Sequence, residues 1–345
     1  MNTVKYTEAR NKYFFIDVRS PSEYNDDTIK GAVNIAILND EERKEVGTTY
    51  VQIGKDEAKR LGVKYISPKM PAIFEQVLEL KHKHNNLVAF CSRGGYRSTY
   101  FASVFSSIGI PICQLEGGYK SYRTKVLELL PELNDKITFI VLNGNTGVGK
   151  TEILHSLSEK GYSVLDLEGA ANHRGSLLGS IGIGTCNSQK KFESNIYEQL
   201  MNAKDNYVFI EAESLKIGSV SIPKFIHNKI KQGIQIFIDA DLQKRILHLK
   251  KDYILNDSWQ EESIRAMDRL SKYIPKEKLD NLKLEVMKGN FDFVAAFLME
   301  KYYDPMYNFK SDKLDYSGIF KYDYSANETA DEIIGWYFDN FNSRI

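Results

Sequence analysis

The segment Gly144–Thr151, GNTGVGKT, constrains the fold of this chain more than any other. It follows the apolar run Ile137–Leu142, which predicts a buried strand, and it precedes Glu152–Lys160, which has the spacing of a helix. The pattern GxxxxGK[ST] between a strand and a helix is typical of a phosphate-binding loop, whose backbone N–H groups and helix N-terminus surround phosphate oxygens. This part of the chain is therefore predicted to be an α/β domain that binds a phosphate compound, which the pattern does not specify.

Side chains of this loop supply positive charge and a metal ligand. The Lys150 ammonium is expected to reach phosphate oxygens, and the Thr151 hydroxyl can ligate Mg²⁺. Apart from a possible Mg²⁺, no tightly bound cofactor is expected. For the acidic partner of the site, Glu211 at the end of the predicted strand Tyr207–Glu211 is the candidate, with Glu213 and Asp239 as alternatives. The predicted phosphate-binding residues are Gly144, Gly147, Gly149, Lys150 and Thr151.

A glycine-rich polar segment follows the next predicted strand, Tyr162–Leu167. Ligands of parallel sheets bind beside the carboxyl ends of the strands, so we expect this segment to lie on the ligand face. The alternative is a mobile surface loop. The candidate residues of the ligand face are Asp166, Glu168, His173, Arg174 and Glu211.

A second reactive segment is Ala89–Ser98, AFCSRGGYRS. The strand predicted over Leu87–Phe90 ends at Cys91, two glycines then allow a tight loop, and a helix is predicted over Ser98–Ser107. Inward-facing N–H groups, the helix N-terminus and the charges of two arginines would all stabilise a thiolate and lower its pKa. An inert buried cysteine does not account for the paired glycines and arginines. The predicted catalytic residues are Cys91, Arg97 and Arg93.

The first part of the chain alternates between predicted strands and helices, as expected for an α/β domain with a parallel sheet. Further strands are predicted over Phe14–Val18, Ile29–Ile35 and Ile112–Leu115, and further helices over Glu41–Glu45, Asp56–Leu61 and Met70–His82, with a break at Gly47–Tyr50. The Pro-containing polar segment Leu129–Lys136 is the predicted linker. We therefore predict two domains, residues 1–134 and 135–345, the second with a helical C-terminal part over Asp257–Ile274, Pro275–Met287, Phe291–Lys301 and Glu328–Phe341.

Composition bounds the environment and the partners of the chain. Its 345 residues suit two domains, and its three cysteines form no CxxC pair, which argues against a disulfide framework or a zinc ribbon. The N-terminal residues lack the apolar core of a signal peptide, and no apolar run is long enough for a membrane span. A cytoplasmic protein without a membrane partner is therefore expected, in a compartment that keeps thiols reduced.

An anionic partner has to be bound by a local patch, because 46 Lys and Arg residues balance 46 Asp and Glu residues. The segment Lys224–Lys251 carries seven Lys or Arg residues against two Asp. Such a segment is either a solvated helix face or a surface for the phosphate backbone of a nucleic acid. The candidate residues for nucleic-acid binding are Lys224, Lys244, Arg245, Lys250 and Lys251.

The first domain resembles a rhodanese domain. The resemblance rests on IDVRSPSEY (Ile16–Tyr24), IKGAVNI (Ile29–Ile35), the Cys91 loop and LEGGYKSYR (Leu115–Arg123), although Thr28 stands where many rhodaneses carry His. The spacing Cys-x5-Arg is one residue longer than in the usual sulfurtransferase loop. A larger loop also suits a phosphate, as in the related dual-specificity phosphatases, although Phe90 stands where those enzymes usually have His.

The two halves together resemble the tRNA 2-selenouridine synthase family over nearly the whole chain. The motifs that carry this resemblance are NDEERKEVGTTY (Asn39–Tyr50), CSRGGYRS, GNTGVGKT, DLEGAANHRGS (Asp166–Ser176), SQKKFE (Ser188–Glu193), ESLKIGS (Glu213–Ser219) and YYDPMY (Tyr302–Tyr307). Where the family usually has an aromatic residue after the cysteine, this chain has Ser92.

The resemblance implies a tRNA-modifying transferase that replaces the sulfur of 2-thiouridine at the wobble position with selenium. Its co-substrates would be selenophosphate, drawn from a selenophosphate supply enzyme, and geranyl diphosphate, which alkylates the sulfur first. Cys91 would then carry or deliver selenium, and the phosphate-binding loop would hold the diphosphate. Two alternatives remain: a Cys-x5-Arg phosphatase or sulfurtransferase coupled to a nucleotide-binding P-loop domain, and a kinase-like P-loop enzyme whose rhodanese domain only docks a sulfur carrier.

Overall fold

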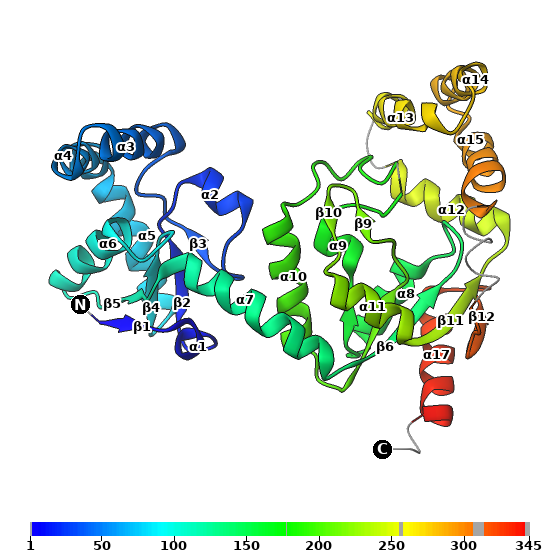
Figure 1. The fold of residues 1–345 in the computed structure, drawn as a ribbon, viewed down its shortest axis with the longest axis horizontal. Coiled ribbons are helices and arrows are strands. Elements are labelled where there is room, and N and C mark those ends of the chain that lie inside the picture. The colour runs from blue at the N-terminus through cyan, green and yellow to red at the C-terminus, as the bar shows by residue number, and fades with distance from the viewer. Residues whose placement is uncertain (1, 177, 255–257, 306–313, 342–345) are drawn as a thin grey trace. The chain divides into compact units, whose positions relative to one another are not determined.

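The computed structural model describes residues 2–176, 178–254, 258–305 and 314–341, and the chain divides into two compact units, residues 1–129 and 130–345. The predicted linker does not interrupt the helix before it, because α7 runs over Gly118–Asp135 with Pro131 inside it (Figure 1). Each unit has its own buried apolar core.

The first unit is built on a five-stranded parallel sheet with the strand order β1-β5-β4-β2-β3. This arrangement confirms the predicted rhodanese-like α/β domain with a parallel sheet. The predicted strand at Ile29–Ile35 shrinks to two residues. The strands are β1 (Thr3–Val4), β2 (Phe14–Asp17), β3 (Val33–Asn34), β4 (Leu87–Phe90) and β5 (Ile112–Leu115).

Helices surround this sheet, and one of them corrects the sequence prediction. Residues Gly47–Tyr50 do not break the chain, because α3 continues through them from Asp40 to Gln52. Asn39 and Glu42 start this helix with reciprocal side-chain to backbone bonds of 2.8 Å, and a glycine inside a helix costs only about 1 kcal/mol. The helices are α1 (Tyr6–Ala9), α2 (Pro21–Asp26), α3, α4 (Lys55–Ile66), α5 (Met70–Lys83), α6 (Tyr96–Ser107) and α7.

The second unit contains another five-stranded parallel sheet, with the order β12-β11-β6-β8-β7. It confirms the predicted P-loop-like domain. The sequence analysis missed β12, a short edge strand whose Ile319 is 71% exposed and whose Phe320 alone is buried. The strands are β6 (Thr138–Asn143), β7 (Val164–Leu165), β8 (Tyr207–Glu211), β11 (Ile234–Asp239) and β12 (Gly318–Lys321).

Helices and one small hairpin complete this unit. The helices nearest the sheet are α8 (Lys150–Glu159), α9 (Leu167–Ala171), α10 (Gln189–Met201), α11 (Lys224–Gln232), α12 (Leu242–Tyr253) and α17 (Ala326–Phe341), and the hairpin pairs β9 (Lys216–Ile217) with β10 (Val220–Ser221). The predicted helical part gathers beside α12 (Figure 1) as α13 (Trp259–Met267), a 3-10 turn (Asp268–Lys272), α14 (Lys276–Met287), α15 (Phe291–Leu298) and a π-helical turn (Met299–Tyr303). The start of the predicted helix at Asp257 and the last two residues of the motif Tyr302–Tyr307 lie outside the described residues. Within the described ranges, no helix is both long enough and apolar enough to cross a membrane.

Candidate functional sites

Cys91 follows the last residue of β4 and lies in a loop that stabilises its thiolate. Its side chain is nearly buried, Gly95 N–H donates to Sγ at 3.3 Å, and the Ser98 hydroxyl lies 3.2 Å from Sγ. Burial by itself raises the pKa of the Cys91 thiol, but the hydrogen bonds from Ser98, the charge of Arg97 and the backbone of Arg93 outweigh burial and lower this pKa overall. The loop is therefore suited to nucleophilic chemistry.

The first residues of α7 position the Cys91 loop through backbone hydrogen bonds. The N–H groups of Tyr119 and Lys120 donate to the carbonyl oxygens of Cys91 and Ser92 at 2.9 and 3.0 Å. Gly118 makes this approach possible, since a Cβ there would lie 2.2 Å from the Cys91 oxygen. The second glycine of LEGGYKSYR thus has a physical role that the sequence pattern did not reveal: it lets the carbonyl groups of the Cys91 loop face the start of α7.

Arg97 is bound by an acidic residue that the sequence analysis did not select. Its guanidinium donates to both carboxylate oxygens of Glu23, at 2.5 and 3.1 Å, and to the Ser92 hydroxyl at 2.9 Å. Burial raises the pKa of Glu23, but the bonds from Arg97 dominate and hold it at about 2. Glu23 also accepts from Ser20 N–H at the start of α2, so in the sequence it is indistinguishable from an ordinary helix-capping residue. Arg93 is exposed, and within the described part of the chain no side chain binds its guanidinium.

The predicted phosphate-binding loop joins β6 to α8, and its glycines are required by close approaches. All three have positive φ angles, of +148° at Gly144, +81° at Gly147 and +87° at Gly149. A Cβ at Gly144 would lie 2.5 Å from the oxygen of Ile238, and one at Gly149 would lie 2.8 Å from the ring of Tyr322. The backbone can therefore curl around one point only with glycine at these positions.

Thr151 and Glu211 face each other across the start of α8. The Thr151 hydroxyl donates to Glu211 Oε2 at 3.2 Å, and Lys150 Nζ lies over the loop, 2.9 Å from the Gly144 oxygen. Glu211 is buried, and its Oε1 has no hydrogen-bond partner among the residues that the structure describes. Of the three acidic candidates, Glu211 accepts this hydrogen bond from the loop threonine, while Asp239 is exposed.

Three further carboxylates make this site electronegative. A Cβ at Gly175 would lie 2.6 Å from Glu168 Oε1 and 2.7 Å from Glu213 Oε1, so both side chains lie against the same glycine. Burial, followed by the charges of Asp166 and Glu213, raises the pKa of Glu211 to about 8, and burial with the charges of Glu211 and Glu213 raises the pKa of Glu168. Asp166 itself caps α9 by accepting from Gly169 N–H at 2.7 Å. Such a site favours a bound cation.

Two residues of α12 hold the outer side of the phosphate-binding loop. Arg245 donates to the oxygen of Thr146 at 2.9 Å, and His248 Nδ1 lies 2.8 Å from the oxygen of Gly147. The Arg245 guanidinium is buried and pairs with Asp304 through two bonds of 2.9 and 2.6 Å. The prediction that Arg245 contacts nucleic acid is corrected by this burial: Arg245 positions the loop.

The other basic candidates differ in how they are paired. Lys250 pairs with Asp292 at 3.0 Å, and Lys251 lies 3.7 Å from Glu152. Lys244 binds Asp323 through both a backbone oxygen and the carboxylate. Lys224, on α11, is exposed and has no ion pair within the described ranges.

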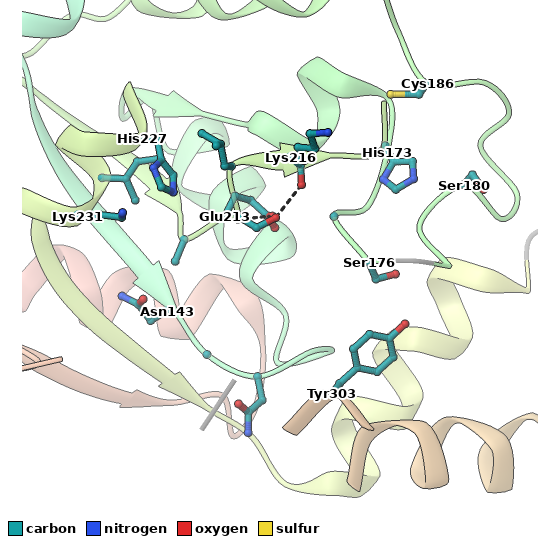
Figure 2. Close-up of a pocket in the computed structure, with 18 of the residues that line it drawn as sticks. Asn143, His173, Ser176, Ser180, Cys186, Glu213, Lys216, His227, Lys231 and Tyr303 are labelled. Atoms are coloured by element: carbon teal, nitrogen blue, oxygen red, sulfur yellow. Dashed lines mark hydrogen bonds between the residues drawn. The ribbon is translucent and has the colours of Figure 1, made fainter. Parts of the chain in front are cut away.

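A pocket of about 1510 Å³ opens beside the first residues of the phosphate-binding loop. Figure 2 shows His227 and Lys231 of α11 on one side, and His173, Ser176 and Ser180 of the glycine-rich segment on the other. Arg174 faces elsewhere: it donates to the Ile181 oxygen at 2.7 Å, and its guanidinium lies 5.1 Å from the Tyr253 ring centre. The predicted ligand face thus includes His173 in the pocket wall, whereas Arg174 organises the segment.

A second, narrow cleft of about 60 Å³ touches the same loop at Thr146. It shares Ser176 and Tyr303 with the large pocket, and its wall is otherwise mostly hydrocarbon. The apolar side chains that line it include Leu178, Ile181, Leu249, Trp259, Met267, Phe291, Val294, Ala295, Leu298 and Met299.

A cysteine loop on one parallel sheet and a phosphate-binding loop on another define the class, a rhodanese domain joined to a P-loop domain. Residues 3–125 match the family described as rhodanese-like domain, and residues 137–334 match the family described as tRNA 2-selenouridine synthase AAA domain. The chain belongs to the tRNA 2-selenouridine synthase family.

Two individual relatives agree with this assignment. The chain is 31% identical to the tRNA 2-selenouridine synthase of Hydrogenovibrio crunogenus over 88% of this chain and 92% of that relative. It is 35% identical to the one of Nitrosomonas europaea over 70% of this chain and 63% of that relative. A solved N-terminal domain of a putative ATP/GTP binding protein from Clostridium difficile 630 is 41% identical over 36% of this chain and 99% of that chain, with a TM-score of 0.36.

Proposed function

We propose that this chain is an enzyme that converts 2-thiouridine at the wobble position of tRNA into 2-selenouridine, in two half-reactions. The relatives named tRNA 2-selenouridine synthase support the overall conversion. The observation that carries the division into two steps is that the chain has two different reactive loops, a thiolate loop at Cys91 and a phosphate-binding loop at Lys150, each in its own compact unit.

In the first half-reaction, the sulfur of 2-thiouridine attacks C1 of geranyl diphosphate. The S–C bond forms, the C–O bond to the diphosphate breaks, and the N3 proton of the base leaves. The loop N–H groups and Lys150 offset the charge that develops on the departing diphosphate, which is the kind of stabilisation that contributes most to group transfer.

A Mg²⁺ ion would assist this step, and the residues present suit it. Thr151 Oγ1 and the Glu211 carboxylate, with its unpartnered buried oxygen, would hold the ion against the diphosphate, where it would neutralise charge. Among the described residues no three His, Cys, Asp or Glu side chains form a metal cluster, but a Mg²⁺ bound mainly through phosphates and water needs only one or two protein ligands.

The apolar cleft at Thr146 supports a hydrocarbon chain as the group attached to the phosphates. A nucleoside needs hydrogen-bond partners for its base and ribose, and the mostly hydrocarbon wall of this cleft offers few of them. The geranyl chain needs none, and Met267 and Met299 in the wall are flexible side chains that adapt to an apolar ligand. We therefore place the chain of geranyl diphosphate in this cleft.

In the second half-reaction, selenium replaces the geranylthio group at C2 of the base. A C–Se bond forms, the C–S bond breaks and geranyl thiol leaves, which an S-alkylated carbon permits far more readily than a thiocarbonyl. Cys91, whose pKa is lowered, delivers the selenium: its thiolate attacks the phosphorus of selenophosphate, the P–Se bond breaks, the released selenide attacks C2 of the base, and water then hydrolyses the S-phosphocysteine to phosphate. Selenophosphate brings a phosphate group to the exposed cation of Arg93 and to the loop N–H groups, and a selenophosphate supply enzyme would be the partner at this step.

Mass spectrometry of nucleosides tests the proposal. Purified chain is incubated with tRNA that contains 2-thiouridine, with geranyl diphosphate alone or together with selenophosphate. We expect S-geranyl-2-thiouridine in the first mixture and 2-selenouridine in the second. If neither nucleoside forms while the chain hydrolyses an aryl phosphate in a Cys91-dependent reaction, the phosphatase alternative replaces this proposal.

A further inference from the structure

The large pocket beside the phosphate-binding loop has a cationic rim that the proposed function does not yet use. Lys216 of β9, Lys231 of α11 and Arg269 are exposed and line the pocket, while Glu213 is the one carboxylate among its described lining residues. Within the described ranges, the ammonium groups of Lys216 and Lys231 form no ion pair. Their charges are available to an anionic ligand that approaches the mouth of the pocket.

The lysines of α12 offer a direct contrast. Lys244, Lys250 and Lys251 each have a carboxylate partner within 4 Å. A lysine with such a partner has to give up that interaction before it binds a phosphate, and its charge is already balanced locally. The positive charge at the pocket rim is therefore available to a ligand, whereas the charges of these three α12 lysines are largely balanced by their carboxylate partners.

Aromatic rings line the pocket at two places. Tyr302 and Tyr303 form an edge-to-face pair with ring centres 4.9 Å apart, and Phe237 and Tyr316 form a tilted pair at 5.1 Å. Rings beside a cationic rim are the usual means by which proteins hold an unstacked base of single-stranded RNA, since every base has a flat face that stacks. The volume of about 1510 Å³ leaves ample room for one nucleotide and its two flanking phosphates.

His173 adds a polar group to the pocket wall. Its side chain is 5% exposed, and Nδ1 has no hydrogen-bond partner in the described part of the chain. Burial and the charges of Arg269 and Arg174 lower the pKa of His173, so the imidazole is neutral at pH 7 and presents one donor and one acceptor nitrogen. Buried polar groups are rarely left without partners, so this histidine indicates a polar ligand.

We propose that this pocket takes up a single unstacked nucleotide of the RNA substrate, with Lys216, Lys231 and Arg269 on its flanking phosphates and His173 at the edge of its base. The inference rests on the proposed function and specifies where the wobble base would meet the geranyl diphosphate. Gly144 and Asn145 of the phosphate-binding loop line this pocket, and the adjacent Thr146 lines the apolar cleft. The base and the hydrocarbon chain thus approach the loop from two sides of the wall formed by Ser176 and Tyr303.

A pair of double variants separates the rim from α12. Lys216→Ala with Lys231→Ala removes two charges at the rim, and the matched control, Lys250→Ala with Lys251→Ala, removes two on α12. Binding of a fluorescent anticodon stem-loop RNA with 2-thiouridine at the wobble position is measured for the full-length chain over a range of KCl concentrations. The rim variant should bind at least about 10-fold more weakly at low salt, with a slope of log K against log salt that is shallower by about one to two units. The control should stay within about 2-fold of the unaltered chain.

Equal losses in both variants, or a loss only in the α12 variant, would place the RNA elsewhere. An abasic wobble position supplies a second, independent measurement: the unaltered chain should prefer the 2-thiouridine stem-loop about 10-fold, and His173→Leu should reduce that preference. No preference in the unaltered chain would show that the base does not enter the pocket. The nucleoside assay separates this failure from that of the proposed function, because a chain that modifies 2-thiouridine normally but binds through α12 refutes only the pocket.

Discussion

The Ser98 hydroxyl lies 3.2 Å from Cys91 Sγ and accepts a hydrogen bond from Gln114 Nε2 at 2.9 Å. Because Gln114 occupies an acceptor position of this hydroxyl, the hydroxyl proton points at an acceptor, and Sγ at 3.2 Å is slightly nearer than the Gly95 oxygen at 3.3 Å. Ser98 is therefore the side chain that contributes most to a stable thiolate, and Arg97 follows it.

Ser98→Ala should raise the pKa of Cys91 by about one unit or more, and Arg97→Met should raise it less. Only the thiolate reacts with iodoacetamide, so the alkylation rate falls as the pH drops through the pKa, and the curve of each variant should shift to higher pH. The rates are measured across pH 5 to 10 on the full chain, with peptide mapping to select Cys91. An unshifted curve for Ser98→Ala would mean that this hydroxyl does not stabilise the thiolate.

Gly118→Ala should disorganise the Cys91 loop. The new Cβ would lie 2.2 Å from the Cys91 oxygen and 2.5 Å from the Gly94 nitrogen, so the loop has to move. Gly31→Ala is the matched control, because Gly31 also has a positive φ angle but no atom within 4 Å of its Cβ position. The control should lose only about 1 kcal/mol of unfolding free energy and keep the normal rate of Cys91 alkylation. Gly118→Ala should lose stability and also slow Cys91 alkylation at least about 10-fold. Equal effects of the two variants on alkylation would contradict the account of the loop.

Arg245→Met should weaken binding of the diphosphate donor without changing the salt dependence of RNA binding. It removes the bond to the Thr146 oxygen and leaves Asp304 without its partner, at a cost of about 3 kcal/mol in unfolding free energy. Adding Asp304→Leu should restore much of the stability but not the KM for geranyl diphosphate, because the loop bond is still missing. A double variant whose KM returns to normal would show that Arg245 is needed only for folding.

Ala295→Leu should narrow the apolar cleft. We expect weaker binding of geranyl diphosphate by about 10-fold or more and unchanged binding of pyrophosphate, which has no hydrocarbon chain. Calorimetric titration of both ligands measures this difference, and thermal unfolding shows whether the variant is folded. If both ligands lose affinity equally, the cleft does not hold the chain.

The parts of the site that are contiguous in sequence could be predicted, whereas the partners brought together by folding could not. The phosphate-binding loop lies within eight residues, so its strand, glycines and lysine are recognisable from the sequence. The acidic partner was ambiguous for a physical reason: β8 and β11 both pair with β6, so the ends of both strands lie next to the loop. The hydrogen bond from Thr151 to Glu211 favours Glu211.

Ion pairs between residues that are far apart in the sequence could not be predicted from sequence motifs. Arg97 and Glu23 are 74 residues apart, and Arg245 and Asp304 are 59 residues apart. The sequence does not show whether an arginine is buried in an ion pair or exposed, so Arg245 was wrongly grouped with the nucleic-acid candidates. Lys216 and Lys231 were not selected because only folding brings β9 and α11 to the same pocket, and the sequence does not show that these two lysines lie together.

The central claim is that the two loops perform different half-reactions, and separating them by mutation tests it most directly. Lys150→Ala and Cys91→Ser are each assayed by nucleoside mass spectrometry on tRNA that carries 2-thiouridine and on tRNA that already carries S-geranyl-2-thiouridine. Lys150→Ala should slow geranylation by roughly 10²–10³-fold yet still selenate the geranylated tRNA, and Cys91→Ser should geranylate normally and accumulate that nucleoside. Normal geranylation by Lys150→Ala, or failure of both variants at the same step, would contradict the division and indicate one shared site.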